Sequence, residues 1–374
     1  MIFVLSEEFL QLASCEAAAY GAAIENLLTS HTQGWHVFAP SREIGTFIAE
    51  RMRLSDHKAA ILRHHILARS AELLGQARST PRVIYCIPDG SGDLGADERC
   101  LVVPLSAFTD MEACLKSELL VENARRDGQF YLSLAEAMSG GRGRLPLRFD
   151  VVHGGGNTTA DEIERRLPAM RPLLAIVDSD RRSPGGAAGE TLQRSQRVMD
   201  GVDNPLKTLI SLDVRSLENF VPLAAWRRAC EGDPDALAAI EALQRVRDEE
   251  VQTGVPDERS MLRFYSLKRA VKLGDYRKSD LEYRARLRRY AEGRMAPFPN
   301  SEDDPARDSE ELLPPVGGHA LDRLLTMMRS NSAVVDSLLE ELNGGPCWEP
   351  LQRVLMQVIA FGLGGTRIAS APAV

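Results

Sequence analysis

The sequence has little of what marks secreted, zinc-bound or membrane proteins. Its 6 cysteines form no C-x-x-C pair, and none has a histidine at zinc-finger spacing, so neither a disulfide scaffold nor a structural zinc site is predicted. No stretch approaches the roughly 18 apolar residues of a membrane span. The first residues lack the basic segment and the long apolar run of a signal peptide. We therefore expect a cytoplasmic protein with reduced thiols and no membrane contact.

An excess of positive charge is absent too. The 374 residues carry 45 Lys+Arg and 53 Asp+Glu, a formal net charge of −8. This balance argues against a protein that coats nucleic acid through its overall charge, although it leaves room for a local basic groove. The sequence also lacks the P-loop pattern, G-x-x-x-x-G-K followed by Ser or Thr, so no ATP-binding motif of that kind is present.

Short apolar runs that alternate with helical sequence indicate the fold class. Four such runs predict strands at 117–121, 147–152, 173–177 and 208–212. Strands that are apolar throughout and separated by helices are typical of a parallel sheet with helices on its faces. The fold class is therefore α/β, with a Rossmannoid parallel sheet in residues 111–225. A smaller α/β domain of unknown role is predicted in residues 1–110, with strands at 2–5, 35–38 and 82–87.

The chain after residue 225 reads as helical, and its charge is segregated. A basic helical region, 226–296, contains 12 Lys and Arg against 4 Asp and Glu within residues 259–294. Residues 297–318 are acidic and rich in proline, which predicts an exposed linker, and helices are expected again in 319–374. Tyr276, Tyr283 and Tyr290 recur every seven residues. This spacing fits either a stacking surface for nucleic acid or a packing stripe.

Acidic residues follow three of the four predicted strands in residues 111–225. Glu122 follows the first strand, Asp178 and Asp180 follow the third, and Glu218 comes shortly after the fourth. The carboxyl ends of parallel strands meet at one edge of a sheet, where ligands bind. Several carboxylates share a small site only when a cation compensates their charge, and hard oxygen ligands select Mg²⁺ or Mn²⁺. The pattern predicts a divalent-metal site suited to phosphodiester chemistry.

These segments together resemble the TOPRIM domain, which is shared by topoisomerases, bacterial primases and nucleases of the OLD (overcoming-lysogenization-defect) type. The resemblance covers roughly residues 115–222. Besides the acidic residues after the strands, it rests on the helix opening at 127–131, the glycine triplet 154–156 and the Leu-Glu-Asn-Phe element at 217–220. It is closest to TOPRIM-like bacterial anti-phage defence nucleases. Two features depart from the family pattern: Asn123 stands where a glycine usually follows the glutamate, and no glycine follows Asp180 at the usual spacing.

The resemblance implies a metal-dependent endonuclease that hydrolyses DNA or RNA. By their place in the motif, the residues that would bind Mg²⁺ or Mn²⁺ are Glu122, Asp178, Asp180 and Glu218. OLD-type enzymes add a lysine after the acidic motifs, and Lys268 and Lys272 are the candidates for it. The resemblance further implies a cytoplasmic defence effector that acts with an ATPase partner, and a homo-oligomer stays open.

Other interpretations of the same residues stay open. The chain also fits a non-catalytic partner subunit with a degenerate TOPRIM fold, and it fits less well a haloacid-dehalogenase-type phosphatase that uses Asp178 as its nucleophile. Glu218 could interact with the dipole at a helix N-terminus instead of binding a metal. The two lysines could lie on a solvent-exposed helix face. Asp213 and His153 are weaker candidates for a direct role.

Overall fold

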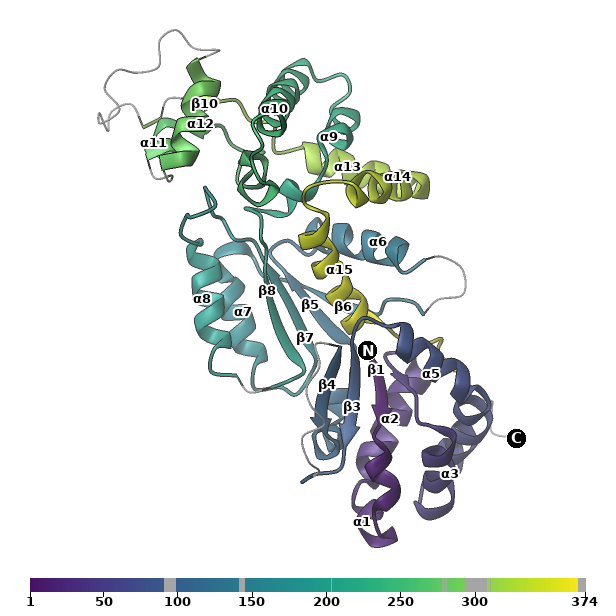
Figure 1. Ribbon diagram of the computed structural model, residues 1–374. Coiled ribbons are helices and arrows are strands. Elements are labelled where there is room, and N and C mark those ends of the chain that lie inside the picture. Colours follow the sequence, from purple (N-terminus) through teal and green to yellow (C-terminus); the bar gives the residue numbers. More distant parts are fainter. Residues whose placement is uncertain are drawn as a thin grey trace.

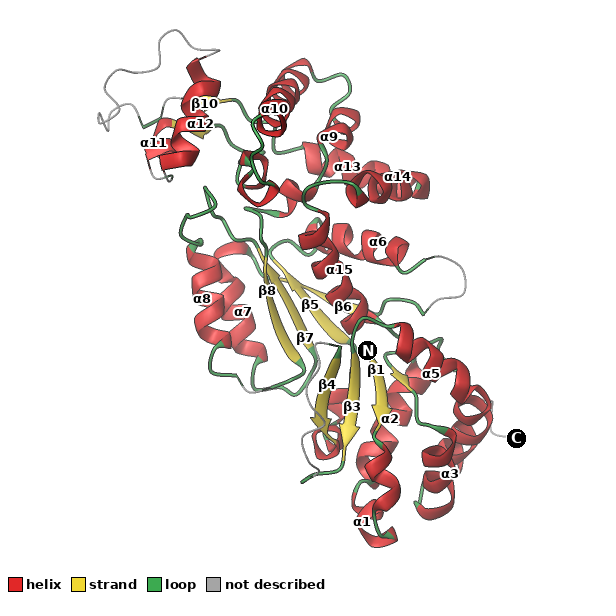
Figure 2. Ribbon diagram, in the orientation of Figure 1, coloured by secondary structure: helices red, strands yellow, loops and turns green. Residues whose placement is uncertain are grey.

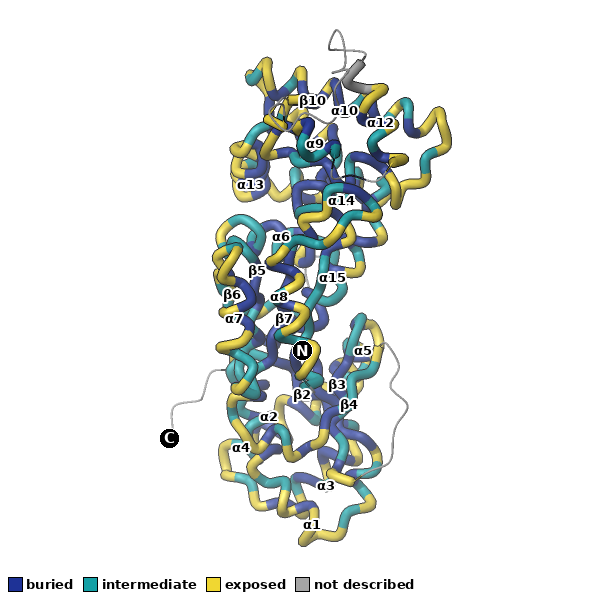
Figure 3. The backbone as a smooth tube through the Cα atoms, turned by 90° about the vertical axis from the view of Figure 1, so that its left-hand side faces the viewer, coloured by how far each residue is buried: buried dark blue, intermediate teal, exposed yellow. Residues whose placement is uncertain are grey.

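The computed structural model of the protein is an elongated stack of three parts. An N-terminal α/β region lies at one end, a second sheet lies in the middle, and a helical cap formed by described residues of 223–343 lies at the other end (Figure 1). Each part has its own buried segments (Figure 3). The structure describes residues 1–90, 99–140, 145–202, 204–277, 279, 281–292, 308–309 and 311–368.

The N-terminal region is the small α/β unit that the sequence predicts. Its four parallel strands lie in the order β2-β1-β3-β4. The strands are β1 (Ile2–Leu5), β2 (Val37–Phe38), β3 (Val83–Ile87) and β4 (Cys100–Pro104). The α-helices are α1 (Ser14–Ala19), α2 (Gly21–Gln33), α3 (Arg42–Arg51), α4 (Asp56–Ile61) and α5 (Ser70–Ser79), and two short helical turns, η2 (Leu62–Ile66) and η3 (Leu67–Arg69), join α4 to α5. The sequence analysis missed β4, because Val103 is its one fully buried residue.

The middle part is a four-stranded sheet in the order β6-β5-β7-β8, parallel throughout. Its strands are β5 (Ser117–Val121), β6 (Phe149–His153), β7 (Leu173–Val177) and β8 (Lys207–Ser211). This arrangement confirms the α/β class with a parallel sheet. Because β5 and β7 are neighbours at the centre of the sheet, the residues that follow them lie side by side at one edge.

Helices cover both faces of this sheet because its strands are apolar on both sides (Figure 2). Leu120, Leu173 and Ala175 form one cluster with residues of α7 (Thr159–Arg166) and α8 (Glu190–Met199). The alternate residues Leu119 and Leu174 join the larger core, to which α6 (Asp127–Met138) and α15 (Trp348–Gly362) contribute. Successive residues of a strand point to opposite faces, so this two-sided burial is what continuous apolar strands predict.

The last helix, α15, packs on the central sheet and not in the helical cap. It lies against α6, β5 and β7, and Ser117 Oγ donates a hydrogen bond to the Phe361 carbonyl over 2.7 Å. Residues 363–368 continue into the N-terminal region, where the Ile368 N–H donates to the Thr32 carbonyl over 2.9 Å. Within 319–374, the described residues 320–330, 332–343 and 348–362 are helical, as expected, but these helices pack in two places. An amphipathic stripe predicts that a helix is buried and does not say against which partner.

The helical cap contains six α-helices in the described residues. They are α9 (Leu223–Ala229), α10 (Pro234–Gln252), α11 (Leu273–Arg277), α12 (Leu281–Glu292), α13 (Ala320–Ser330) and α14 (Ser332–Asn343). It also contains an antiparallel pair, β9 (Val271–Lys272) with β10 (Glu311–Leu313). The exposed-linker prediction for 297–318 is wrong at β10, where Leu312 and Leu313 are buried. Most of that segment, residues 297–307 and 310, lies outside the described residues. Nowhere in the described chain is a helix long and apolar enough to cross a membrane.

The tyrosines of the basic region are packed inside the helical cap. Tyr276 and Tyr283 are 3% and 2% exposed, so their seven-residue spacing marks a packing stripe and not a stacking surface. The side chain of Tyr290 lies outside the described residues. Basic residues here also serve the fold: Arg286 forms a buried ion pair with Glu250 at 3.1 Å. Residues 259–294 have a net charge of +8 from 12 basic and 4 acidic side chains. This value therefore overstates the positive charge that is available to bind a ligand.

α15 lies so close to the sheet that a methyl group added at Gly362 should lower the stability of the protein. An ideal Cβ on Gly362 would lie 2.3 Å from the Phe149 ring, whereas one on Gly75 in α5 would meet nothing within 4 Å. We expect Gly362→Ala to lower the free energy of unfolding by about 1–3 kcal/mol. We expect Gly75→Ala to leave it unchanged or raise it by up to about 1 kcal/mol. Urea unfolding of both variants measures the difference, and equal effects would contradict this packing.

Candidate functional site

Glu122 lies at the end of β5 in a turn that two glycines hold in place. The N–H of Gly154 donates to the Val121 carbonyl over 2.8 Å, and the N–H of Gly155 donates to the Glu122 carbonyl over 3.0 Å. Gly155 has a φ of +75°, and an ideal Cβ on Gly154 would lie 2.6 Å from the Thr159 hydroxyl. The glycine triplet after β6 is therefore needed for its close approach to the backbone of Glu122.

Asn123 takes the place of the glycine that the family pattern expects, and it begins a helix. Its Oδ1 accepts hydrogen bonds from the N–H groups of Arg125 and Arg126, each over 3.1 Å. Its own N–H donates to Asp127 Oδ2 over 2.8 Å. Such reciprocal bonds satisfy the free N–H groups at a helix start. They also fix Asp127 beside the acidic edge, our name for the carboxyl edge of the central sheet with Glu122, Asp178, Asp180 and Glu218. Asp127 is not among the site residues predicted from the sequence.

The Asp178–Asp180 turn is strained and tied to the loop after β8. Asp180 has a φ of +52°, the one positive φ among the non-glycine residues described. Its N–H donates to the Arg215 carbonyl over 2.9 Å, and Asp178 Oδ1 accepts from the N–H of Leu217 over 3.2 Å. A non-glycine residue in this region is uncommon, although aspartate tolerates it better than most residues. The turn brings the loops after β7 and β8 together.

Glu218 is held at the same edge by the asparagine that follows it. The Asn219 side-chain amide donates to the carbonyls of Leu262 and Tyr265, both over 2.7 Å. These bonds fasten the segment that carries Lys268 across the loop after β8. Lys268 Nζ lies 2.7 Å from Glu218 Oε1, and the exposed fractions of the two side chains are 46% and 4%. The Glu-Asn pair thus positions one acid and, through Asn219, the lysine that pairs with it.

The acidic residues at this edge raise one another's pKa. Burial, and after it Asp180 and Asp127, raise the pKa of Glu122 to about 7. Burial raises the pKa of Asp127 to about 6, with a further contribution from Glu218 and in spite of the Asn123 N–H. Burial, followed by Glu122 and Glu218, raises the pKa of Asp178 well above its usual value. These shifts mean that carboxyl groups from β5, β7 and the loop after β8 lie within electrostatic reach of one another.

Two further residues belong to this acidic edge. Burial lowers the pKa of Lys268, but its contacts with Glu218 outweigh burial and leave the pKa raised. Tyr131, on α6, is buried beneath the edge, and burial followed by Asp178 and Asp127 raises its pKa. It therefore keeps its hydroxyl proton and can act only as a neutral donor or acceptor. Tyr131 belongs to the segment 127–131, which is part of the sequence resemblance. That segment was interpreted only as the start of a helix.

The acidic edge has the chemistry of a metal site without the tight geometry of one. Glu122 Oε1 and Glu218 Oε2 are buried and have no hydrogen-bond partner, as expected of oxygens that serve a cation. In the described residues, however, no group of three or more His, Cys, Asp or Glu side chains is arranged closely enough to hold an ion. Among the described residues, the Lys268 ammonium offsets part of the negative charge of these carboxylates.

Three other candidates from the sequence lie apart from this group. Lys272 is exposed on β9, and its backbone N–H contacts Asp275. Of the two candidate lysines, the structure brings only Lys268 to the acidic edge. Asp213 is exposed and pairs with Arg353 of α15. His153 ends β6, where its Nδ1 accepts a hydrogen bond from the Ala124 N–H over 3.4 Å.

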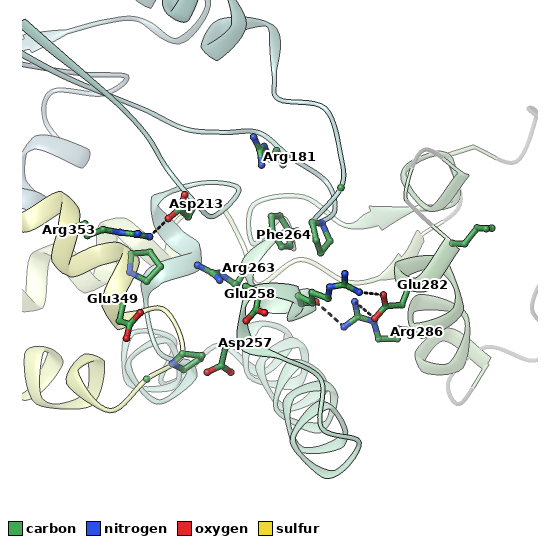
Figure 4. A pocket seen from close by; sticks show the side chains of 17 residues that line it. Arg181, Asp213, Asp257, Glu258, Arg263, Phe264, Glu282, Arg286, Glu349 and Arg353 are labelled. Carbon is green, nitrogen blue, oxygen red and sulfur yellow. Dashed lines mark hydrogen bonds and ion pairs between the residues drawn. The ribbon is translucent and has the colours of Figure 1, made fainter.

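A large cleft lies beside Arg181, the residue that follows Asp180, and its wall contains none of the acidic-edge residues (Figure 4). Its volume is about 1030 Å³, and its wall comes from the Asp180 turn, the loop after β8, the cap and α15. Most of its arginines are paired with acids: Arg259 with Glu282 at 2.6 Å, and Arg353 with Asp213. Arg263 is buried, and its Nε has no hydrogen-bond partner. The Arg263 carbonyl accepts from the N–H of Arg215, the residue bonded to Asp180, so the cleft and the acidic edge share a backbone connection.

Comparison of the chain with protein-family models, with curated proteins and with solved structures finds no significant match. Any function assigned to the acidic-edge residues is therefore based on their geometry and on the sequence resemblance.

The raised pKa of Glu122 predicts a dependence of stability on pH. Its value of about 7 in the folded state, against the usual 4.5, means that the folded protein holds a proton which the unfolded chain releases. Stability therefore falls as the pH rises from about 4.5 to about 7. We expect Glu122→Gln to remove the part of this fall that comes from Glu122, while Asp127 and Asp178, whose pKa values are also raised, keep their part. At pH 8 in EDTA the variant should be more stable than the wild type by about 1–3 kcal/mol.

The matched control is Glu118→Gln on the same strand. Glu118 pairs with Arg166 at 3.1 Å and with Arg171 at 3.3 Å. Its neutralisation removes one acid from both arginines, which keep Glu162 and Asp150 as partners, and it therefore lowers stability. Urea unfolding from pH 5 to pH 8 compares both variants with the wild type. If Glu122→Gln keeps the wild-type pH dependence, Glu122 does not hold the proton.

Proposed function

We propose that the protein is a metal-dependent nuclease of the TOPRIM type. The observation that carries this proposal is that Glu122, Asp178 and Glu218, from neighbouring loops of one parallel sheet, lie within electrostatic reach of one another and of the Lys268 ammonium. Buried carboxylates are costly unless a cation compensates them. A protein that concentrates them at the ligand-binding edge of an α/β sheet gains from this only if a cation binds there.

The donor set favours Mg²⁺ or Mn²⁺ as that cation. Every ligand candidate is a carboxylate oxygen, and hard oxygen ligands prefer these ions to zinc. The two buried oxygens without a partner, on Glu122 and Glu218, support these residues as ligands together with Asp178 and Asp180. When bound, the ion would lower the pKa of a water molecule and offset charge on the phosphate.

The other residues would position the substrate and balance charge. Lys268 is about half exposed and reaches the acidic edge from the solvent side, so its ammonium can turn from Glu218 to a phosphate oxygen. Tyr131 stays protonated and can donate one hydrogen bond. The cleft beside Arg181 is large enough for nucleotides that flank the cleaved bond, and the exposed arginines of its wall, Arg181 and Arg259, can contact their phosphates.

The biological setting is also part of the proposal. The resemblance to bacterial anti-phage nucleases favours a DNA or RNA substrate and an ATPase partner, since this chain has no P-loop of its own. The choice between DNA and RNA stays open. A non-catalytic subunit with the same fold is the alternative that the following experiment distinguishes.

The first prediction concerns cleavage. With Mn²⁺, the wild-type protein should cut plasmid DNA or structured RNA, and Asp178→Asn should reduce the rate by more than about 100-fold because it removes a ligand. Asp200→Asn is the control, since Asp200 is exposed at the end of α8. Gel assays of both substrates measure the rates. If the wild type cuts neither substrate, or if Asp178→Asn cuts equally well, the non-catalytic alternative is favoured.

The second prediction concerns metal affinity and does not depend on cleavage. If the Lys268 ammonium compensates the carboxylates, it competes with an arriving cation, so Lys268→Met should tighten Mn²⁺ binding by about tenfold. Lys272→Met, on exposed β9, should change it by less than about twofold. Titration calorimetry with Mn²⁺ measures both. Weaker binding in Lys268→Met would mean that the lysine supports the metal site and does not stand in for the ion.

A further inference from the structure

A second cavity lies in the N-terminal region, on a different part of the molecule from the acidic edge. Its volume is about 320 Å³, and its wall is made by α2, β2, the turns η2 and η3, α5, Leu145 and the last described residues, 365–368. Cavities of this size are at the lower end of those that hold small molecules. The sequence analysis gave residues 1–110 no role.

The C-terminal wall of this cavity is fixed in place. The Ile368 N–H donates to the Thr32 carbonyl, and the Gly364 N–H donates to the Pro146 carbonyl, both over 2.9 Å. Gly34, at the end of α2, has a φ of +71°, and an ideal Cβ there would lie 2.6 Å from the Gly365 carbonyl oxygen. The cavity is therefore built by segments from both ends of the chain.

The titratable side chains that line the cavity in the described part of the chain are all basic, and Thr366 adds a neutral polar residue. The basic residues are His31, His65, Arg69 and Arg367, and no described Asp or Glu lines the cavity. Arg69 also bonds Glu72, at 2.6 Å and 2.8 Å, so one of the two guanidinium groups is partly compensated. The cavity still carries a net positive charge, and arginine forks match the geometry of phosphate and carboxylate oxygens.

His31 places a neutral donor at the buried side of the cavity. It is 8% exposed, and its Nδ1 accepts a hydrogen bond from the Phe38 N–H over 3.1 Å. That bond puts the ring proton on Nε2, which has no bonding partner in the described part of the chain. Burial, and then Arg69 and His65, lower the pKa of His31 to about 4, so the ring stays neutral at physiological pH. Because His31 lines the cavity, this N–H can donate a hydrogen bond to a ligand there.

The remaining wall is apolar and comes from Val37, Leu73, Leu145 and Ile368. A free inorganic anion would use the basic side and leave this surface in contact with water. We propose that the cavity binds a small phosphorylated molecule with an apolar or aromatic body. Arg69, Arg367 and His65 hold the phosphate, His31 donates from the buried side, and the apolar wall covers the body. This site does not depend on the proposed nuclease function.

Three probes separate the parts of the proposal: inorganic phosphate, adenosine and adenosine monophosphate. The full-length protein is titrated with each by calorimetry in EDTA, which prevents metal-mediated binding at the acidic edge. The monophosphate should bind more tightly than phosphate by about tenfold or more, since it also buries an aromatic ring, and adenosine alone should bind most weakly. Equal binding of phosphate and the monophosphate would overturn the apolar part of the proposal.

The variant Arg69→Gln/Arg367→Gln tests whether binding occurs in this cavity. Both side chains are exposed, so the variant should fold, and thermal unfolding checks that it does. It should bind the monophosphate at least about tenfold more weakly, through the loss of charge-assisted bonds. Arg53→Gln, at an exposed arginine outside the cavity, should bind like the wild type. The proposal is wrong if neither phosphate nor the monophosphate binds, or if the double variant binds unchanged.

Discussion

The mutual repulsion of carboxylates at the carboxyl edge of the central sheet is the constraint on which the site depends. Glu122, Asp127 and Asp178 all have raised pKa values, with burial as the main cause and neighbouring acids as a second one. The fold opposes this repulsion by fastening each loop separately. Asn123 orders the turn that leads into α6, the glycine triplet holds the Glu122 turn, and Asn219 fixes the segment that carries Lys268. Without these bonds, repulsion would separate the acids and the site would be lost.

Much of the sheet could be predicted from the sequence, because each of its strands is a short apolar run of its own. β5 and β7 lie where they were expected, and β6 and β8 overlap the expected runs. β4 was missed because it is half buried, and β10 was missed because its two leucines follow an acidic run. The partner of α15 could not be predicted, since an amphipathic stripe carries no information about the surface that it covers.

The acidic candidates were found because strand ends of a parallel sheet meet at one edge, a rule that needs no coordinates. Asp127 was missed for a physical reason: an acid in the first turn of a helix is usually explained by the helix dipole. Only the distance to its neighbours shows that it belongs to the acidic edge. The choice between Lys268 and Lys272 also needed the structure. A spacing of four residues suggests one helix face, but Lys272 lies on a strand and Lys268 in the segment before it.

The two cavities are connected by one continuous part of the chain. Glu349 and Arg353, near the start of α15, line the cleft beside Arg181, and residues 365–368, just beyond its end, line the N-terminal cavity. Between them α15 packs on β5 and β7, the strands that lead to Glu122 and Asp178. Close-packed elements do not deform continuously. The C-terminal wall is held from two sides, by the bonds of Gly364 and Ile368 to the rest of the chain and, through α15, by packing on the sheet that carries the acids. Residues at the two ends of the chain thus share one mechanical element with the candidate site.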